Sequence, residues 1–208
     1  MNLAGCASLL RGPLTGTWYR AFHPRFLPTA LATAHTALFP SRYNEGASAL
    51  PQFEILYLAE DHQVSLLEVG ALVGSPLPRS GRNPALIPNP ASPWTILPVT
   101  VHLQSIADLA RPSQLALLKT TAQEITGDWE ANSARTPGDS VNQPIGTAPT
   151  QELGQALHGV IDLEGFQSIS AKMPTKRTLM VFPDRLRRGS YIEYKDAATG
   201  SVERIEAH

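Results

Sequence analysis

The sequence contains a single cysteine, Cys6, among 208 residues. One thiol cannot form an internal disulfide, which excludes a disulfide-stapled secreted fold and favours a reducing compartment. No stretch approaches the roughly 18 consecutive apolar residues that a transmembrane helix needs. The segment LAGC near the start resembles a lipoprotein cleavage box, but neither a basic region nor a long apolar run accompanies it. We therefore expect a cytoplasmic protein that does not bind a membrane.

An excess of charge of one sign is also lacking. Lysine and arginine number 17 against 18 acidic residues, a formal net charge of −1, so no direct nucleic acid binding is expected. The sequence has no glycine-rich phosphate loop, no GxSxG motif and no cluster of histidine, cysteine and carboxylate at metal-ligand spacing. The six histidines are scattered. A serine hydrolase and a zinc enzyme are therefore disfavoured, and no metal site is expected.

Proline and glycine, by contrast, are plentiful: 18 and 15 residues, which indicates many loops and short elements. We find no internal repeat and no domain linker, so the sequence predicts one α+β domain over residues 1–208. Its core is expected to be a mixed or antiparallel sheet with flanking helices. The expected strands cover residues 17–22, 53–59, 94–103, 166–170 and 179–182, followed by a hairpin over 190–207 that turns near Thr199 and Gly200. Pro98 marks a bulge or an edge position in its strand.

The remaining segments divide into expected helices and loops. Residues 29–38 are alanine-rich and predict either a helix or a loop with helical turns. A single helical turn is expected over 105–110, a helix capped by Ser113 over 113–121, and an amphipathic helix capped by Thr150 over 150–161. Residues 75–93 and 131–149 are rich in proline, glycine, asparagine and serine and predict irregular loops.

The stretch from residue 53 to residue 74 reads as one strand running directly into one helix. Asp61 is the expected N-cap, and the helix is predicted over 62–74. Its apolar stripe consists of Val64, Leu67, Glu68, Ala71 and Leu72. A carboxylate on that stripe has two explanations, because burying it without partners is costly. Glu68 either reaches water at the margin of the stripe or serves as a catalytic acid in a cleft beside Tyr57, near the end of the strand.

Short motifs along the chain, taken together, are similar to those of the RES-domain family. In order they are WYR, SRYNEG, ILYLAEDHQVSLLEV, PTQELG, GFQSISAK and LMVFPD, which span about residues 17–184. The family pattern has tryptophan where this chain has Tyr43, and arginine where it has Lys172. The late serine of the pattern corresponds to Ser168 or Ser170, and SAK favours Ser170. Residues 185–208 would form a C-terminal hairpin extension.

The resemblance implies a fold like that of ADP-ribosyltransferases and NAD as the substrate, with no cofactor. RES proteins cleave the bond between nicotinamide and ribose, and they are best known as toxins of bacterial toxin–antitoxin pairs. The resemblance therefore implies a NAD glycohydrolase or phosphorylase whose partner is an antitoxin with an Xre-type helix-turn-helix domain. One alternative is a protein ADP-ribosyltransferase that uses the same site. A second, from another class, is a non-catalytic module that binds a nucleotide or a partner protein.

Cleavage of a glycosidic bond builds positive charge on the ribose, which a carboxylate can stabilise. On the resemblance, that carboxylate is Glu68, and Ser170 orients it or contacts the ribose. The pyrophosphate needs paired donors, for which Arg20 is the first candidate and Arg42 the second. Tyr57 or Tyr43 could stack on the nicotinamide. Considered without the family, each of these residues has an ordinary structural role as its alternative: a surface charge, a loop anchor, a core aromatic or a local backbone hydrogen bond.

Overall fold

The computed structural model describes residues 1–75, 85–89, 93–133, 146–197 and 199–207. Its strands are β1 (Arg11–Phe22), β2 (Leu56–Ala59), β3 (Leu72–Ser75), β4 (Ala85–Pro88), β5 (Thr95–Asp108), β6 (Gly165–Ile169), β7 (Arg177–Val181), β8 (Tyr191–Lys195) and β9 (Val202–Glu206). The α-helices are α1 (His62–Glu68), α2 (Pro112–Leu117), α3 (Ala122–Thr126), α4 (Glu130–Ser133) and α5 (Pro149–His158). Short 3-10 helices are η1 (Leu3–Ser8), η2 (Pro24–Thr29), η3 (Ala34–Ala37), η4 (Gly46–Ser48) and η5 (Pro183–Arg185).

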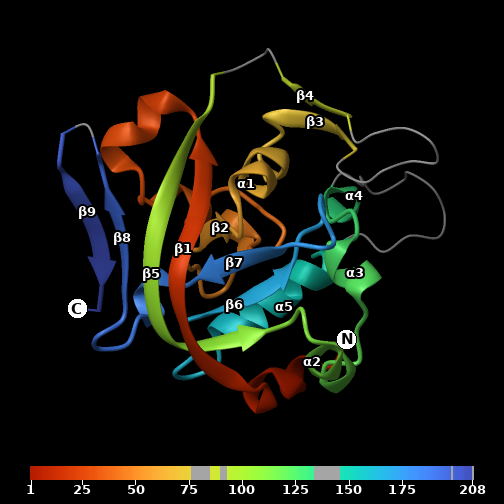
Figure 1. The fold of residues 1–208 in the computed structure, drawn as a ribbon. Helices are drawn as coiled ribbons and strands as arrows, with labels where there is room; N and C mark the ends of the chain where they lie inside the picture. The colour runs from red at the N-terminus through yellow and green to blue at the C-terminus, as the bar shows by residue number, and fades with distance from the viewer. Residues whose placement is uncertain (76–84, 90–92, 134–145, 198, 208) are drawn as a thin grey trace.

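A seven-stranded sheet in the order β1-β2-β7-β6-β5-β8-β9 forms the centre of the molecule (Figure 1). β1 pairs with β5 along nearly its whole length and with β2 at Tyr19 and Ala59, so β1, β2, β7, β6 and β5 close into a barrel. β5 and β6 run parallel, whereas the other neighbours in this sheet are antiparallel. The expected α+β fold with a mixed sheet is confirmed.

The barrel interior is filled by side chains that alternate along the strands. On β5, Leu97, Val99, Val101 and Leu103 are buried and the residues between them are exposed, which is the period of a strand with one face in a core. Leu56 and Leu58 of β2, with Leu179 and Val181 of β7, belong to the same cluster. The barrel therefore has a packed interior rather than a channel.

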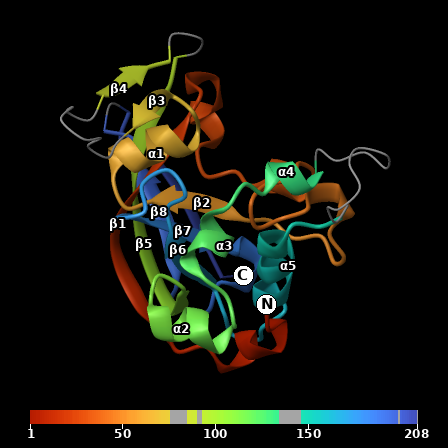
Figure 2. The ribbon, with the colours of Figure 1, turned by 90° about the vertical axis from the view of Figure 1, so that its right-hand side faces the viewer.

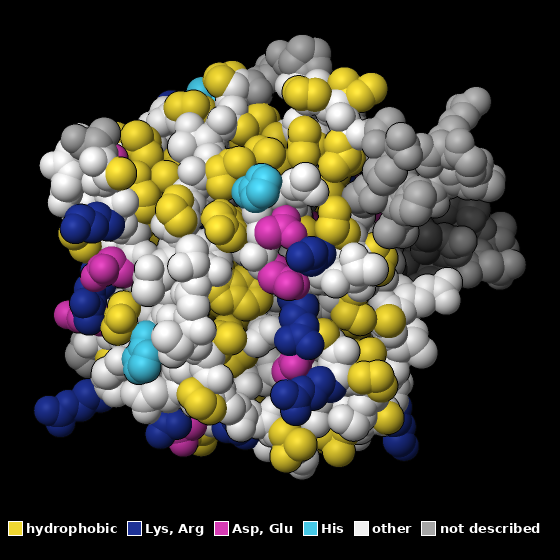
Figure 3. All heavy atoms as spheres, viewed as in Figure 1, with side chains coloured by type: hydrophobic (Ala, Val, Ile, Leu, Met, Phe, Trp, Pro, Cys, Tyr) yellow, Lys and Arg dark blue, Asp and Glu magenta, His cyan; other side chains and the backbone are white. Residues whose placement is uncertain are grey.

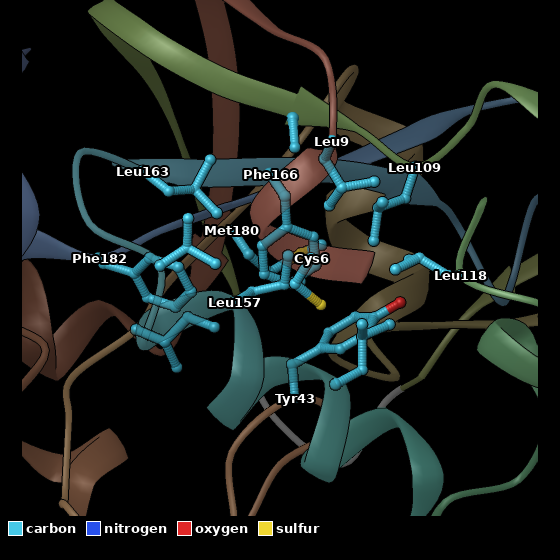
Figure 4. Packing of buried hydrophobic residues seen from close by; sticks show 14 of the residues in the cluster. Cys6, Leu9, Tyr43, Leu109, Leu118, Leu157, Leu163, Phe166, Met180 and Phe182 are labelled. Atoms are coloured by element: carbon cyan, nitrogen blue, oxygen red, sulfur yellow. The ribbon is translucent and has the colours of Figure 1, made fainter. Parts of the chain in front are cut away.

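A second core lies on the outer face of β2, β6 and β7. There α5 contributes Leu153 and Leu157, which pack with Phe166, Phe182 and Tyr43 (Figure 4). Figure 2 shows α2, α3 and α5 together on one side of the strands. These short helices cover one face of the sheet. α1 is not part of this layer and lies apart from it, near β3.

The predicted helix over 62–74 is too long, because α1 ends at Glu68. Gly70 has a φ of 71°, and the amides of Gly70 and Ala71 donate to the carbonyls of Leu67 and Leu66. This is a Schellman motif, in which a glycine in the left-handed region closes a helix. Leu72 then begins β3, which pairs with β4 inside the segment that we expected to be irregular.

Other boundaries also differ from the expectation. Residues 105–108 are strand rather than a helical turn. α2 has Arg111 rather than Ser113 as its N-cap, and α5 has Ala148 rather than Thr150. Residues 29–38 contain the last residue of η2 and the short η3, and β1 begins six residues before the expected strand. Of the expected loop over 131–149, residues 134–145 lie outside the described residues. The Asp61 cap, β6, β7 and the C-terminal hairpin are confirmed.

Candidate functional site

Glu68 is the last residue of α1, and its side chain is exposed. Ser170, directly after β6, donates from Oγ to Glu68 Oε1 at 2.6 Å. The same Oγ accepts the backbone amides of Lys172 at 3.2 Å and Met173 at 3.0 Å. Because these two donors occupy the oxygen, the single hydroxyl hydrogen of Ser170 is directed to the carboxylate. Ser170 is fully buried, so it fixes one oxygen of an otherwise open carboxylate.

Tyr57 lies on β2 with its side chain toward the turn that contains the SRYN motif. Its hydroxyl lies 2.8 Å from Ser41 Oγ and accepts the amide of Tyr43 at 3.2 Å. Burial raises the pKa of Tyr57 well above its usual range, so the phenol stays neutral. The residue as a whole remains partly exposed. Tyr57 therefore connects the strand to the turn without being fully buried.

Tyr43, the residue that replaces the family tryptophan, is fully buried. Its hydroxyl lies 2.8 Å from Ser168 Oγ, and its ring meets Phe166 edge-on at 5.0 Å between centroids. Burial raises the pKa of Tyr43 to about 12. The Arg42 guanidinium opposes that shift in pKa, and the Glu68 carboxylate adds to it, which places both charges near this phenol. Tyr43 thus occupies the core behind the carboxylate rather than a surface on which a ring could stack.

Arg42 is half-buried and is held by carbonyl groups at the end of α3. Its Nη1 donates to Gly127 O at 2.5 Å and to Ile125 O at 3.4 Å. Its Nη2 and Nε have no hydrogen-bond partner among the residues that the structure describes. The guanidinium is therefore anchored on one side and keeps donors on the other.

The turn over residues 41–46 is fixed by α5. Gln151 donates to Ser41 O at 3.0 Å and accepts the amide of Ala148, the N-cap of α5. At Gly154, an added Cβ would lie 1.8 Å from Tyr43 O, so only glycine allows the helix to approach this backbone so closely. Asn44 is fully buried and accepts Gly46 N, as expected for a residue that stabilises its own turn. The TQELG motif thus acts on the site by positioning the SRYN turn.

Arg20 lies on the opposite face of β1 from this group. Trp18 and Phe22, two residues to either side, are in the barrel core, whereas Tyr19 pairs with Ala59 and places its ring 6.2 Å from that of His62 on α1. Arg20 donates to Ala30 O at 2.7 Å and to Ala32 O at 3.3 Å. Burial lowers its pKa to about 10, although the Glu203 carboxylate acts in the other direction.

The structure thus brings five of the six candidates together, which we call the Glu68 group: Glu68, Ser170, Tyr57, Tyr43 and Arg42. It does not bring Arg20 to them. Ser41, which holds the Tyr57 hydroxyl, was missed, and the sequence gives no signal for it beyond its place in the SRYN motif.

The described residues contain neither a metal-binding cluster nor a membrane-spanning helix. No group of three or more histidine, cysteine or carboxylate side chains is arranged to hold a metal ion within the described ranges. In the same part of the chain, no helix is both long and apolar enough to cross a membrane.

Comparison with known proteins agrees with the motifs. The chain matches the RES domain over residues 17–202. Among solved structures it is similar to a chain of the toxin–antitoxin complex MbcT–MbcA of M. tuberculosis, with 16% identity and a TM-score of 0.61 over 98% of this chain and 91% of that one. No curated protein matches the sequence. Since the RES match covers most of the chain, including every residue of the Glu68 group, this protein belongs to the RES-domain family.

Proposed function

We propose that this protein is a NAD-degrading toxin that cleaves the bond between nicotinamide and ribose, as a glycohydrolase or a phosphorylase. The observation that carries the proposal is the exposed Glu68 carboxylate, which the buried Ser170 hydroxyl holds at 2.6 Å. Its membership of the RES family and its likeness to a chain from a toxin–antitoxin complex support this reading.

In the proposed reaction, the glycosidic carbon–nitrogen bond breaks and nicotinamide leaves with the bonding electrons. Positive charge develops on the ribose, and the Glu68 carboxylate stabilises it because a fixed charge needs no reorganisation as the bond breaks. Water or phosphate then forms the new bond to the ribose carbon. Ser170 acts as a positioning residue, since its hydrogen bond leaves the second carboxylate oxygen of Glu68 available to the substrate.

Tyr57 is the aromatic residue of the site that can offer a ring surface to nicotinamide, because Tyr43 is fully buried. For the pyrophosphate we propose Arg42 in preference to Arg20. Arg42 adjoins Tyr43 and uses only Nη1 on carbonyl groups, so Nη2 and Nε have no partner among the described residues. Arg20 instead uses both Nη1 and Nη2 on carbonyls at the far side of β1. We further propose that an antitoxin, with an Xre-type domain, covers Glu68 in the resting complex.

The test is release of free nicotinamide from NAD by the purified protein, with and without phosphate in the buffer. Glu68→Gln keeps the shape of the side chain, and we expect it to lower the rate by about a hundredfold or more. Glu152→Gln, on the exposed face of α5, is the matched control and should retain the rate. A Glu68→Gln protein with the wild-type rate would contradict the mechanism.

The same assay separates the alternatives. Release in both buffers supports hydrolysis, and release only with phosphate supports phosphorolysis. If release requires an added protein, mass spectrometry of that protein will show whether ADP-ribose has been transferred to it. If the folded protein, free of any partner, releases no nicotinamide under any of these conditions, the function is that of a non-catalytic binding module.

A further inference from the structure

A concave surface lies at the end of the barrel where β1 begins and β5 ends. It encloses about 350 Å³, within the range of small-molecule sites. Its polar lining consists of Arg11, Arg111, Arg177, Gln114, Gln167 and Asp108. None of these residues belongs to the Glu68 group. Gln167 lies between Phe166 and Ser168 on β6 and faces away from them, so this hollow and Ser170 are on opposite faces of the strand.

Both glutamine amides of the hollow have a defined orientation. Gln114 Oε1 accepts the backbone amide of Leu10 at 2.9 Å, and Gln167 Oε1 accepts Arg177 Nη1 at 3.2 Å. Since each partner is a donor, the amide oxygen is fixed toward it, and the NH₂ group is the end that is left to donate a hydrogen bond. Gln114 is only 4% exposed, and its Nε2 has no hydrogen-bond partner among the described residues. An amide donor on a largely buried side chain therefore lines the hollow.

Two of the three guanidiniums of the hollow share one carboxylate. Asp108 Oδ2 accepts Arg111 Nε at 3.0 Å and lies 3.5 Å from Arg177 Nη1, while Oδ1 accepts the amide of Ala110. Both oxygens of Asp108 are thus occupied, and the carboxylate acts as a holder for the two arginines. Arg11 is held separately through Ile161 O and Ala7 O. Three positive charges against one negative charge leave the lining with a surplus of two positive charges.

The surface above the hollow differs from it in charge balance. Lys176 lies between Glu60 and Asp61, at 3.8 and 3.1 Å, so the upper part of this face is compensated. Figure 3 shows the column of alternating acidic and basic side chains on this face of the molecule. The uncompensated charge is found where the arginines line the hollow.

We propose that this hollow binds a small molecule that carries a phosphate group. A phosphate dianion matches the surplus charge, and its several acceptor oxygens match the guanidinium and amide groups that line the hollow. The site is separate from the NAD reaction and does not depend on it. Two kinds of molecule carry such a phosphate group: free phosphate and a phosphate ester such as a nucleoside monophosphate.

The test is isothermal titration calorimetry with inorganic phosphate and, separately, with AMP, at constant ionic strength with chloride as the balancing anion. We expect Arg111→Gln to weaken binding by about tenfold or more, since a hydrogen bond to a charged group is lost. The side chain of Arg111 is 63% exposed, so this variant should fold. Gln114→Glu keeps the acceptor for Leu10 but places a negative charge in the hollow, and it should abolish binding.

Arg188→Gln is the matched control, because Arg188 is exposed and does not line the hollow. Glu68→Gln should also leave phosphate binding unchanged, which separates this proposal from the NAD chemistry. Tighter binding of AMP than of phosphate identifies an ester as the ligand, and equal binding identifies free phosphate. The proposal is overturned if neither ligand binds the wild type, or if Arg188→Gln weakens binding as much as Arg111→Gln does.

Discussion

Replacing Ser170 by alanine tests whether the carboxylate of this site is held in place by one buried hydroxyl. The substitution removes the 2.6 Å hydrogen bond to Glu68 and the acceptor for the amides of Lys172 and Met173. The volume change is a single oxygen atom, so repacking of the core contributes little. The effects on activity and on stability therefore come from the hydrogen bonds alone.

The two effects have different magnitudes. A hydrogen bond to a charged group contributes about 1.5–3 kcal/mol, so loss of the Glu68 orientation should lower nicotinamide release by about 10- to 100-fold. The two amides also lose their acceptor, and that of Met173 is buried. Each such loss costs about 1–3 kcal/mol, and because the Lys172 amide is only part-buried we expect a decrease of about 2–4 kcal/mol in the free energy of unfolding. Urea unfolding followed by circular dichroism measures this decrease.

Ser168→Ala is the control, because Ser168 is also fully buried on β6 and also bonds through its hydroxyl. Its partner is the neutral phenol of Tyr43, which retains the carbonyl of Ile125 at 3.4 Å as a second contact. We expect a loss of about 1 kcal/mol in the free energy of unfolding and a rate within about threefold of the wild type. Equal loss of activity in both variants, or wild-type activity in Ser170→Ala, would refute the assignment of Ser170 as the residue that positions Glu68.

Four further substitutions have defined outcomes. Glu164→Gln should lower the free energy of unfolding in urea by about 3 kcal/mol or more, because the buried Glu164 carboxylate accepts three backbone amides at 2.6, 2.7 and 2.8 Å and an amide group would oppose at least one of them. Asp61→Ala should cost about 1 kcal/mol at neutral pH through the lost cap of α1. Burial alone would raise the pKa of Asp61, but a hydrogen bond from the first turn and the Lys176 ammonium hold it below its usual value. The contribution of Asp61 is therefore present above the ordinary carboxyl pKa and is lost as the pH falls through the folded-state pKa, so the difference between the two proteins should vanish in acid urea titrations. Arg42→Lys should raise KM for NAD more than Arg20→Lys does, whereas Arg20→Lys should mainly lower the melting temperature. If Arg20→Lys raises KM more than Arg42→Lys does, Arg20 rather than Arg42 binds the pyrophosphate.

The local sequence predicted helices, strands and turns correctly where the residues inside the element determine its type. Asp61 caps α1 because its side chain reaches the amide of Val64, three residues along the same chain. Alternation predicted β5, and the turn residues around Gly200 predicted the C-terminal hairpin. The end of α1 was also available in the sequence, since Gly70 supplies the positive φ that closes the helix.

Residues 105–108 show where local reasoning fails. β5 pairs with β8 at residues 100–102 and with β6 at residues 106–108, and between them the amides of Gln104 and Ser105 donate to the Glu164 carboxylate. That carboxylate comes from a residue about 60 positions away. On its other edge β5 also stays paired with β1 through Ile106 and Ala107. The strand continues because β1 and a distant carboxylate hold it, and no local pattern contains either contact.

The candidate site divides in the same way. The sequence by itself determined which residue types are present, their order and their family, and therefore named six candidates: Glu68, Ser170, Tyr57, Tyr43, Arg42 and Arg20. Only the tertiary structure decided which of them meet, because Glu68 and Ser170 are 102 residues apart and Arg20 is directed by the alternation of β1 to the other face. The chemistry of each side chain follows from its identity in the sequence, whereas the distances between side chains arise when β1, β2, β7, β6 and β5 close into a barrel.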